Sequence, residues 1–168
     1  MDNATFKSKW ANWKLIALVL IIIAVFVKFF VLGDGDENAP VTVEIDLSEV
    51  AFRSELEVEA ILGKGKLDSY FRDVNVNCEK CPKMIYREDK VEIIYINGIA
   101  DRIKINKLSD FDFKDRVILG LLGLKDYIPA TSEDDDVKRW DNYQKYAQIA
   151  AFSKKGKIEY ILIKSKTL

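Results

Sequence analysis

The chain has 168 residues, with 26 basic and 27 acidic side chains and no histidine. The lack of histidine removes the usual proton shuttle, the commonest metal ligand and every catalytic triad that relies on imidazole. Residues 1–33 hold four Lys and one Asp, a net charge of +3, so the remainder carries −4 of the total of −1. A mildly acidic remainder lacks the excess of basic residues that binds the phosphates of DNA or RNA, and we predict no nucleic-acid partner.

The N-terminal part of the chain is strongly apolar. The stretch from Leu15 to Leu32 contains 17 apolar residues in 18, interrupted only by Lys28. A helix of this length reaches about 27 Å, close to the hydrocarbon thickness of a bilayer. Lysines precede it and acidic residues follow it. This pattern predicts a cytoplasmic N-terminus at 1–14, a single transmembrane anchor at 15–33 in contact with the lipid bilayer, and an extracytoplasmic remainder. A cleaved secretory signal and a buried core helix are the two alternatives.

A polar linker at 34–40 leads into a domain at 41–168. The first helix of this domain is indicated by Ser54 and Glu57, whose spacing fits a capping box, and by Gly63, which suits the helix C-terminus.

A hairpin follows the first helix. The dipeptide Asn97-Gly98 lies between the β-rich runs 91–96 and 99–105, which is the strongest short-range hairpin signal. Strand-like residues begin at about Lys83, so we expect a three-stranded meander after the helix.

The same order of signals recurs later in the chain. Asp112 is a candidate N-cap, Gly123 suits the end of a second helix, and Gly156 marks a second hairpin turn. Gly123 follows Gly63 by 60 residues, and Gly156 follows Gly98 by 58. The runs expected to form strands in this second part are 137–143, 148–152 and 158–163.

These patterns predict an α+β fold class. After the N-terminal transmembrane helix we expect two tandem helix-plus-three-strand meander repeats, at about 54–106 and 110–166. Together they would form one antiparallel sheet with the helices on one face, because a single repeat hardly buries both a helix and a sheet face. Chance similarity between two ordinary α+β segments is the alternative.

The repeats resemble the SmpA/OmlA fold of bacterial envelope lipoproteins, which is also seen doubled in β-lactamase-inhibitor proteins. The second copy carries the resemblance through Leu121-Leu122-Gly123, Trp140 with Tyr143, Gly156 and the run 158–163, and the first through Ile61-Leu62-Gly63, Gly98 and the run 103–105. The chain departs from the family where Lys64 and Leu124 replace a proline after the helix, and where the lipid-bearing cysteine is missing. The resemblance implies a binding or assembly module rather than an enzyme.

The motif Cys78-Glu79-Lys80-Cys81 is the sharpest local feature. In an oxidising compartment we expect the two cysteines to form a disulfide that stiffens the connection between the first helix and the first hairpin. A thiol-redox site is the functional alternative. Two cysteines without histidine cannot supply the four ligands of a structural zinc site, and we predict no metal or cofactor. The acidic run 133–136 is interpreted as a solvated loop, with a weak cation site as the alternative.

Aromatic residues are the candidates for partner binding, because Tyr and Trp on an open sheet face make good anchors. The candidates are Tyr86, Tyr95, Trp140, Tyr143 and Tyr146. Packing of these rings in the core is the alternative. Trp140 and Tyr143 have opposite parity along a regular strand, so they cannot share a face unless a bulge or turn intervenes.

The sequence contains no constellation of catalytic residues, and we predict a protein that is not an enzyme. The predicted function is a membrane-anchored, extracytoplasmic protein-interaction module of the bacterial envelope, single-pass with its N-terminus in the cytoplasm, which binds an envelope protein. One alternative is a thiol-disulfide redox protein that uses Cys78 and Cys81. The other is a secreted enzyme inhibitor, if the N-terminal segment is cleaved.

Overall fold

The computed structural model describes residues 18–22 and 41–166, and the chain divides into two units after Pro40. Of the first unit, only residues 18–22 are described, and they are helical. Within the described ranges, no helix has the length and apolar character needed to cross a membrane, so the predicted N-terminal transmembrane helix at 15–33 is not found. The predicted cytoplasmic segment 1–14, the linker 34–40 and most of 15–33 lie outside the described residues.

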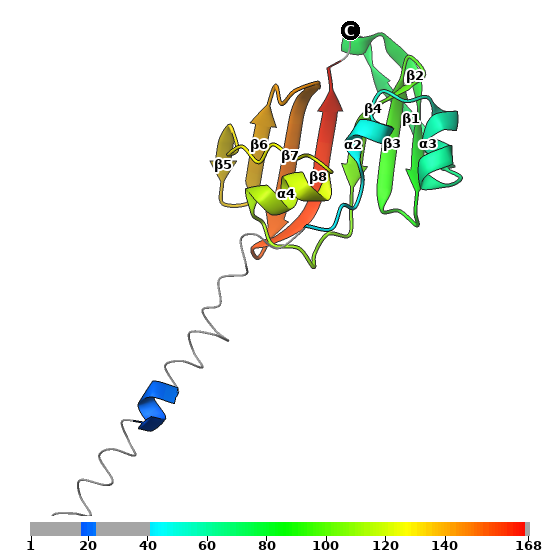
Figure 1. Ribbon diagram of the computed structural model, residues 1–168. Helices are drawn as coiled ribbons and strands as arrows, with labels where there is room; N and C mark the ends of the chain where they lie inside the picture. Colours follow the sequence, from blue (N-terminus) through cyan, green and yellow to red (C-terminus); the bar gives the residue numbers. More distant parts are fainter. Residues whose placement is uncertain (1–17, 23–40, 167–168) are drawn as a thin grey trace, which may run out of the picture. The chain divides into compact units, whose positions relative to one another are not determined.

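The second unit is built on one antiparallel sheet of eight strands, ordered β1-β2-β3-β4-β8-β7-β6-β5 (Figure 1). Each half of the unit is a four-strand meander, and the two halves meet where β4 pairs with β8. The strands are β1 (Lys66–Asp73), β2 (Cys78–Tyr86), β3 (Val91–Ile96), β4 (Ile99–Ile105), β5 (Ser132–Asp134), β6 (Val137–Asp141), β7 (Tyr146–Lys154) and β8 (Lys157–Ser165).

The helices of this unit are short. They are α2 (Leu47–Val50), α3 (Glu55–Leu62) and α4 (Asp115–Leu121), with a 3-10 turn η1 (Val74–Val76) after β1. The predicted capping box of α3 is present, since Ser54 and Glu57 each accept a hydrogen bond from the other's backbone N–H. The N-cap of α4 is Lys114 rather than Asp112, whose carboxylate instead accepts a hydrogen bond from Lys157 at 2.7 Å.

The predicted fold class is wrong in its repeats as well as in its anchor. Four strands, not three, follow each of the two longer helices, and the unit is mainly sheet. The strands that were not predicted are the sheet edges β1 and β5. Their residues are almost all exposed, so neither edge shows the apolar alternation by which a half-buried strand is recognised.

One face of the sheet is covered and the other is open. Buried apolar residues alternate along the central strands and pack against the helical residues in a single core. From the sheet, this core includes Val91, Ile93, Tyr95, Ile103, Ile105, Ile149, Ala151, Ile161 and Ile163. Because successive side chains point to opposite faces, the residues between them, such as Arg102, Lys104 and Leu162, lie on the open face.

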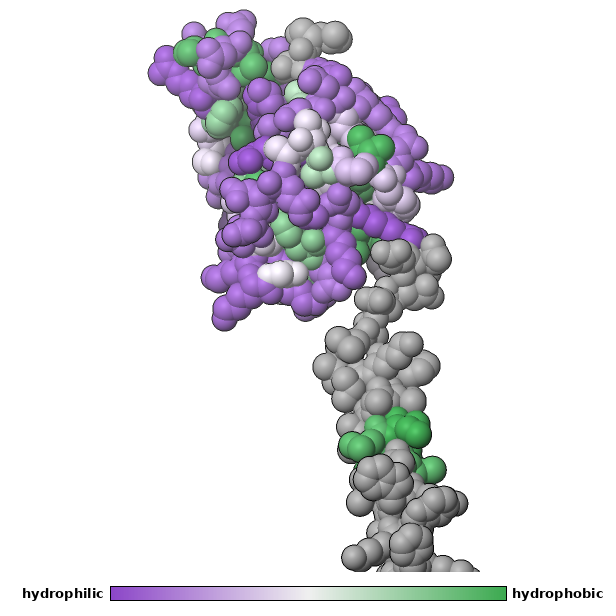
Figure 2. Space-filling view, turned by 90° about the vertical axis from the view of Figure 1, so that its left-hand side faces the viewer, coloured by the Kyte–Doolittle hydropathy of each residue, from purple (hydrophilic) through white to green (hydrophobic). Residues whose placement is uncertain are grey.

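The β5 edge of the sheet is short and charged. Its three residues, Ser132, Glu133 and Asp134, are exposed, and the surface on this side of the domain is mainly hydrophilic (Figure 2). A charged, three-residue edge strand resists pairing with another chain. The acidic run 133–136 occupies the end of β5 and the turn after it. Its first residue, Glu133, forms an ion pair with Lys138 at 3.0 Å. In the described part of the chain, no group of three or more acidic or cysteine side chains is placed to hold a metal ion.

A comparison of Gly98 with Gly123 separates the cost of a left-handed backbone from the cost of close packing. Both have positive φ, +81° and +71°, but a Cβ at 98 would meet nothing within 4 Å, whereas one at 123 would lie 3.2 Å from the Cα of Asp46. We expect Gly98→Ala to lower the free energy of unfolding by about 1 kcal/mol, from the left-handed conformation alone. Gly123→Ala should lower it further, because the Asp46 backbone must also move. Urea unfolding followed by circular dichroism measures both, and equal losses would contradict the close approach.

Candidate functional site

The five aromatic residues predicted to anchor a partner are all buried. Tyr86, Tyr95, Trp140, Tyr143 and Tyr146 expose at most 3% of their surface and belong to the core under the helices. They are therefore not exposed anchors on the open face, and the alternative of packing in the core is what the structure shows. Trp140 and Tyr143 both reach the core despite their opposite parity, because β6 ends at Asp141 and Asn142 turns the chain with a φ of +55°.

The polar atoms of four of these rings form hydrogen bonds inside the protein. The Trp140 indole donates to the carbonyl of Ile128 at 2.9 Å, and the Tyr143 hydroxyl donates to the carbonyl of Asp126 at 2.7 Å. The hydroxyls of Tyr86 and Tyr95 lie 2.7 Å apart in a buried hydrogen bond. Burial raises the pKa of both tyrosines above the ordinary value, so both remain protonated at neutral pH.

The sulfur atoms of Cys78 and Cys81 lie 1.98 Å apart, at disulfide distance. The pair is not in the connection between helix and hairpin, where we expected it, but inside β2. There Cys78 and Cys81 pair with Asp73 and Phe71 of β1. Between these two pairs β2 has one residue more than β1, which is a β-bulge. Both cysteines are buried in a small apolar cluster with Ile96. This position favours a structural role, because a redox-active cysteine must be accessible.

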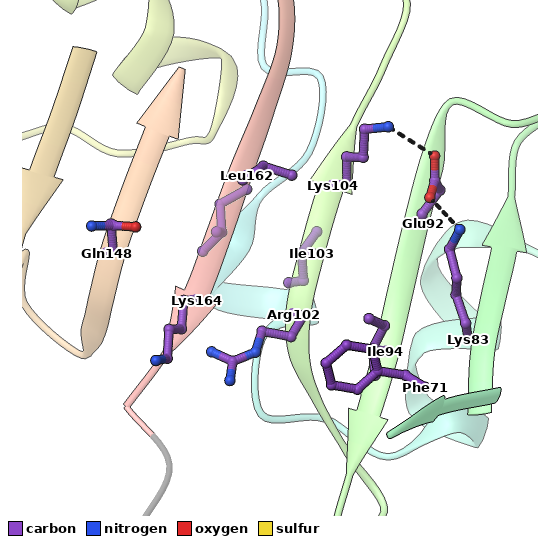
Figure 3. A pocket seen from close by; sticks show the side chains of 11 residues that line it. Phe71, Lys83, Glu92, Ile94, Arg102, Ile103, Lys104, Gln148, Leu162 and Lys164 are labelled. Carbon is purple, nitrogen blue, oxygen red and sulfur yellow. Dashed lines mark hydrogen bonds and ion pairs between the residues drawn. The ribbon is translucent and has the colours of Figure 1, made fainter. Parts of the chain in front are cut away.

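The open face of the sheet contains a hollow of about 380 Å³ (Figure 3). It extends from β1 to β7 and so draws on both halves of the unit. Its lining residues are Phe71, Lys83, Glu92, Ile94, Arg102, Ile103, Lys104, Gln148, Leu162, Ile163 and Lys164. Four of these are cations and one is an anion, which leaves a net charge of +3 (4 − 1) on a chain whose total is −1.

Apolar side chains lie among these charges. Leu162, Ile94 and Phe71 all line the hollow, and Leu162 is 38% exposed. Beyond the hollow, Phe152 and Tyr160 stack with their ring centroids 4.6 Å apart. Their strand positions have the same parity as Ala150 and Leu162, so this stack continues the open face. Both rings are half-buried, and the sequence analysis did not select them. The alternation with the buried Ile161 and Ile163 would have placed Tyr160 and Leu162 on the open face.

At one end of the hollow the charges neutralise one another. The Glu92 carboxylate lies 2.7 Å from Lys83 and 3.4 Å from Lys104 (Figure 3). It also accepts a hydrogen bond from the Asn106 amide at 2.7 Å. Partial burial acts to raise the pKa of Glu92, but the hydrogen bonds from Lys83 and Asn106 and the nearby charges outweigh it and hold the pKa below its usual value. The hydrogen bond to Glu92 in turn raises the pKa of Lys83. The charges at this end therefore already have partners within the protein.

At the other end, Arg102 and Lys164 are direct partners across β4 and β8. The Arg102 guanidinium lies 3.3 Å from Asp101 and 3.8 Å from Asp73. Asp101 is 1% exposed, and burial raises the pKa of its carboxyl although the charges of Arg102 and Lys164 act in the opposite direction. Lys164 has no ion pair within 4.0 Å among the residues that the structure describes.

The hollow thus combines an apolar floor with cationic side chains, one acidic group and one amide. This combination suits the binding of a group that has both apolar and anionic parts. Comparison of the chain with family models, with curated proteins and with solved structures finds no match. The resemblance to the SmpA/OmlA fold therefore stays a prediction.

The ion network around Glu92 makes a pH-dependent contribution to stability. Because the pKa of Glu92 is lower in the folded protein than in the unfolded chain, the contribution is present above the unfolded-state pKa and is lost as pH falls through the folded-state pKa. We expect Glu92→Gln to lower the free energy of unfolding by about 1–2 kcal/mol at neutral pH. Urea unfolding at several pH values should show this difference shrinking below about pH 4. A difference that does not change with pH would contradict the assigned network.

The hydroxyl pair of Tyr86 and Tyr95 is tested by a double-mutant cycle. Tyr95→Phe leaves the Tyr86 hydroxyl buried without its partner, and we expect a loss of about 1–3 kcal/mol in unfolding free energy. The double variant Tyr86→Phe with Tyr95→Phe leaves no unpaired hydroxyl. It should therefore be less destabilised than the sum of the two single variants, as measured by urea unfolding. Strictly additive losses would show that the two hydroxyls are not coupled.

Proposed function

We propose that residues 41–168 form a protein-interaction module that binds its partner through the open face of the sheet and carries no catalytic activity of its own. The observation that most supports this function is the hollow across β1–β4, β8 and β7, where exposed Leu162 lies among charged side chains. Apolar side chains within a polar surround are typical of protein interfaces. The Phe152–Tyr160 stack adds aromatic surface on the same face.

The compartment is part of the proposal. A cysteine pair at disulfide distance fits an oxidising environment, which supports a place for this domain outside the cytoplasm, in the bacterial envelope. The partner would then be another protein of the envelope. A thiol-redox function is less well supported, because Cys78 and Cys81 are 2% and 7% exposed and lie under an apolar cluster.

Site-specific photocrosslinking in cells that normally express the protein tests this function. Benzoyl-phenylalanine replaces Leu162 on the open face in the full chain, and a matched variant carries it in place of Leu56 on α3, which is 79% exposed. We expect a discrete crosslinked product of higher mass from position 162 and none from position 56, because only the open face contacts the partner.

Two results would contradict the proposal. One is the absence of any discrete product from position 162. The other is the same set of products from both positions, since that would report exposure alone rather than a specific interface.

A further inference from the structure

We infer that the hollow recognises an extended acidic segment of the partner, with a carboxylate seated between Arg102 and Lys164 and an apolar side chain on Leu162. This inference rests on the proposed function and names the chemistry of its ligand. It starts from the pairing of two cations across neighbouring strands at the centre of the sheet.

The pairing of Arg102 with Lys164 is unfavourable within the sheet, because like charges directly opposite each other on neighbouring strands repel. A second like pair, Lys154 with Lys157, lies at the exposed end of the β7–β8 hairpin and is relieved by Asp112, 2.7 Å from Lys157. At the Arg102–Lys164 pair the relief is uneven. Asp73 and Asp101 lie 3.8 Å and 3.3 Å from Arg102, whereas Lys164 has no direct ion pair with a described residue and feels only the longer-range attraction of the buried Asp101. An added carboxylate would give Lys164 the direct ion pair that it lacks and would also lie beside Arg102.

Leu162, the proposed apolar contact, lies at a fixed distance from Lys164, where the carboxylate would bind. Leu162 lies two residues before Lys164 on β8, and both line the hollow (Figure 3). Residues two apart on one strand are separated by about 7 Å. Side chains two apart in an extended peptide have the same separation, so a segment with the order acidic residue, any residue, apolar residue matches the hollow in length and chemistry.

The remaining charges favour a carboxylate peptide over a ligand with many phosphates. Lys83 and Lys104 are already occupied by Glu92, whose own charge repels further anions at that end. Of the four lining cations, Lys164 alone has no ion pair within 4.0 Å among the described residues. The hollow therefore fits one or two carboxylates beside an apolar group, rather than a phosphate-rich chain or surface.

A labelled peptide probe tests the inference on the full chain in a non-ionic detergent. The probe is a fluorescein-labelled Gly/Ser-flanked peptide with the core Glu-Thr-Leu-Thr-Glu, and the matched control peptide has Gln in place of both Glu. Fluorescence anisotropy at about 20 mM salt measures binding, where charge pairs are little screened. We expect the acidic probe to bind and the Gln probe to bind more weakly.

Lys164→Gln is the main variant, because Lys164 is exposed and has no ion pair in the described structure. We expect it to weaken the acidic probe about fivefold, the loss of one charge pair. Its melting temperature should stay close to that of the unmodified chain, because the repulsion from Arg102 and the attraction to Asp101 are removed together. Lys66→Gln, an exposed lysine of β1 outside the hollow, is the matched control and should leave probe binding unchanged.

Equal binding of the acidic and Gln probes would overturn the inference, as would an equal effect of Lys66→Gln and Lys164→Gln. Binding of phosphatidylglycerol vesicles through Lys164 without binding of the acidic probe would also overturn it, in favour of a lipid headgroup. These failures are distinct from failure of the proposed function. A discrete crosslink from position 162 that persists in Lys164→Gln would keep the interface and remove only its acidic ligand.

Discussion

The pairing of β4 with β8 is the constraint on which the rest of the structure depends. Four residue pairs join the halves: Arg102 with Lys164, Ile103 with Ile163, Lys104 with Leu162, and Ile105 with Ile161. The isoleucine pairs face the helices and join the two parts of the core. The other two pairs face away from the helices, and all four of their residues line the hollow. One register therefore builds both the core and the candidate site, and a slip by one residue would exchange the two faces.

The segment that enters the domain reinforces this junction on the helix side. The backbone N–H groups of Glu44 and Ile45 donate to the carbonyl of Leu121 at the end of α4, in the second half. Further along, the N–H of Phe52 donates to the carbonyl of Ala100 on β4, in the first half. The chain between 44 and 52 thus crosses from one half to the other over the covered face. Because the helices and this segment all lie on that face, the opposite face has no element of the described chain to cover it.

The strength of local signals explains which parts of this fold the sequence predicted. Asn97 and Gly98 both have positive φ in the β3–β4 turn, so the dipeptide signal and the observed hairpin have the same physical cause. Gly63 likewise ends α3 with a φ of +87°. The edge strand β1 was missed because most of its residues are exposed. Its sequence therefore lacks the alternation of apolar and polar residues that indicates a strand, and only the folded structure shows its pairing with β2.

The candidate site was harder to predict than the fold. The partner-binding candidates were chosen because they are aromatic. Whether a side chain is buried, however, depends on which face of its strand it occupies and on turns whose positions the sequence alone does not give. At a register shift in the β3–β4 pairing, for example, Asp101 is an extra residue on β4, so Ala100 and Ile103 both reach the core despite their opposite parity. The alternation of Arg102 and Lys104 with Ile103 and Ile105 was visible in the sequence. Its meaning depends on β8 lying beside β4, which joins residues about 60 positions apart and is a property of the fold.

A comparison of magnitudes shows why the charges of the open face say something about function. Each isoleucine fully buried at the β4–β8 junction contributes about 1.5–3 kcal/mol, whereas a cross-strand pair at the surface changes stability by about 0.2–1 kcal/mol. Burial of Ile103, Ile105, Ile161 and Ile163 therefore sets the register whatever lies opposite on the open face. Nothing in the packing requires two cations to face each other at Arg102 and Lys164, since any polar pair would preserve the fold. Asp73 and Asp101 supply counter-charge to Arg102 from within the domain, and the proposed acidic segment would supply it to Lys164.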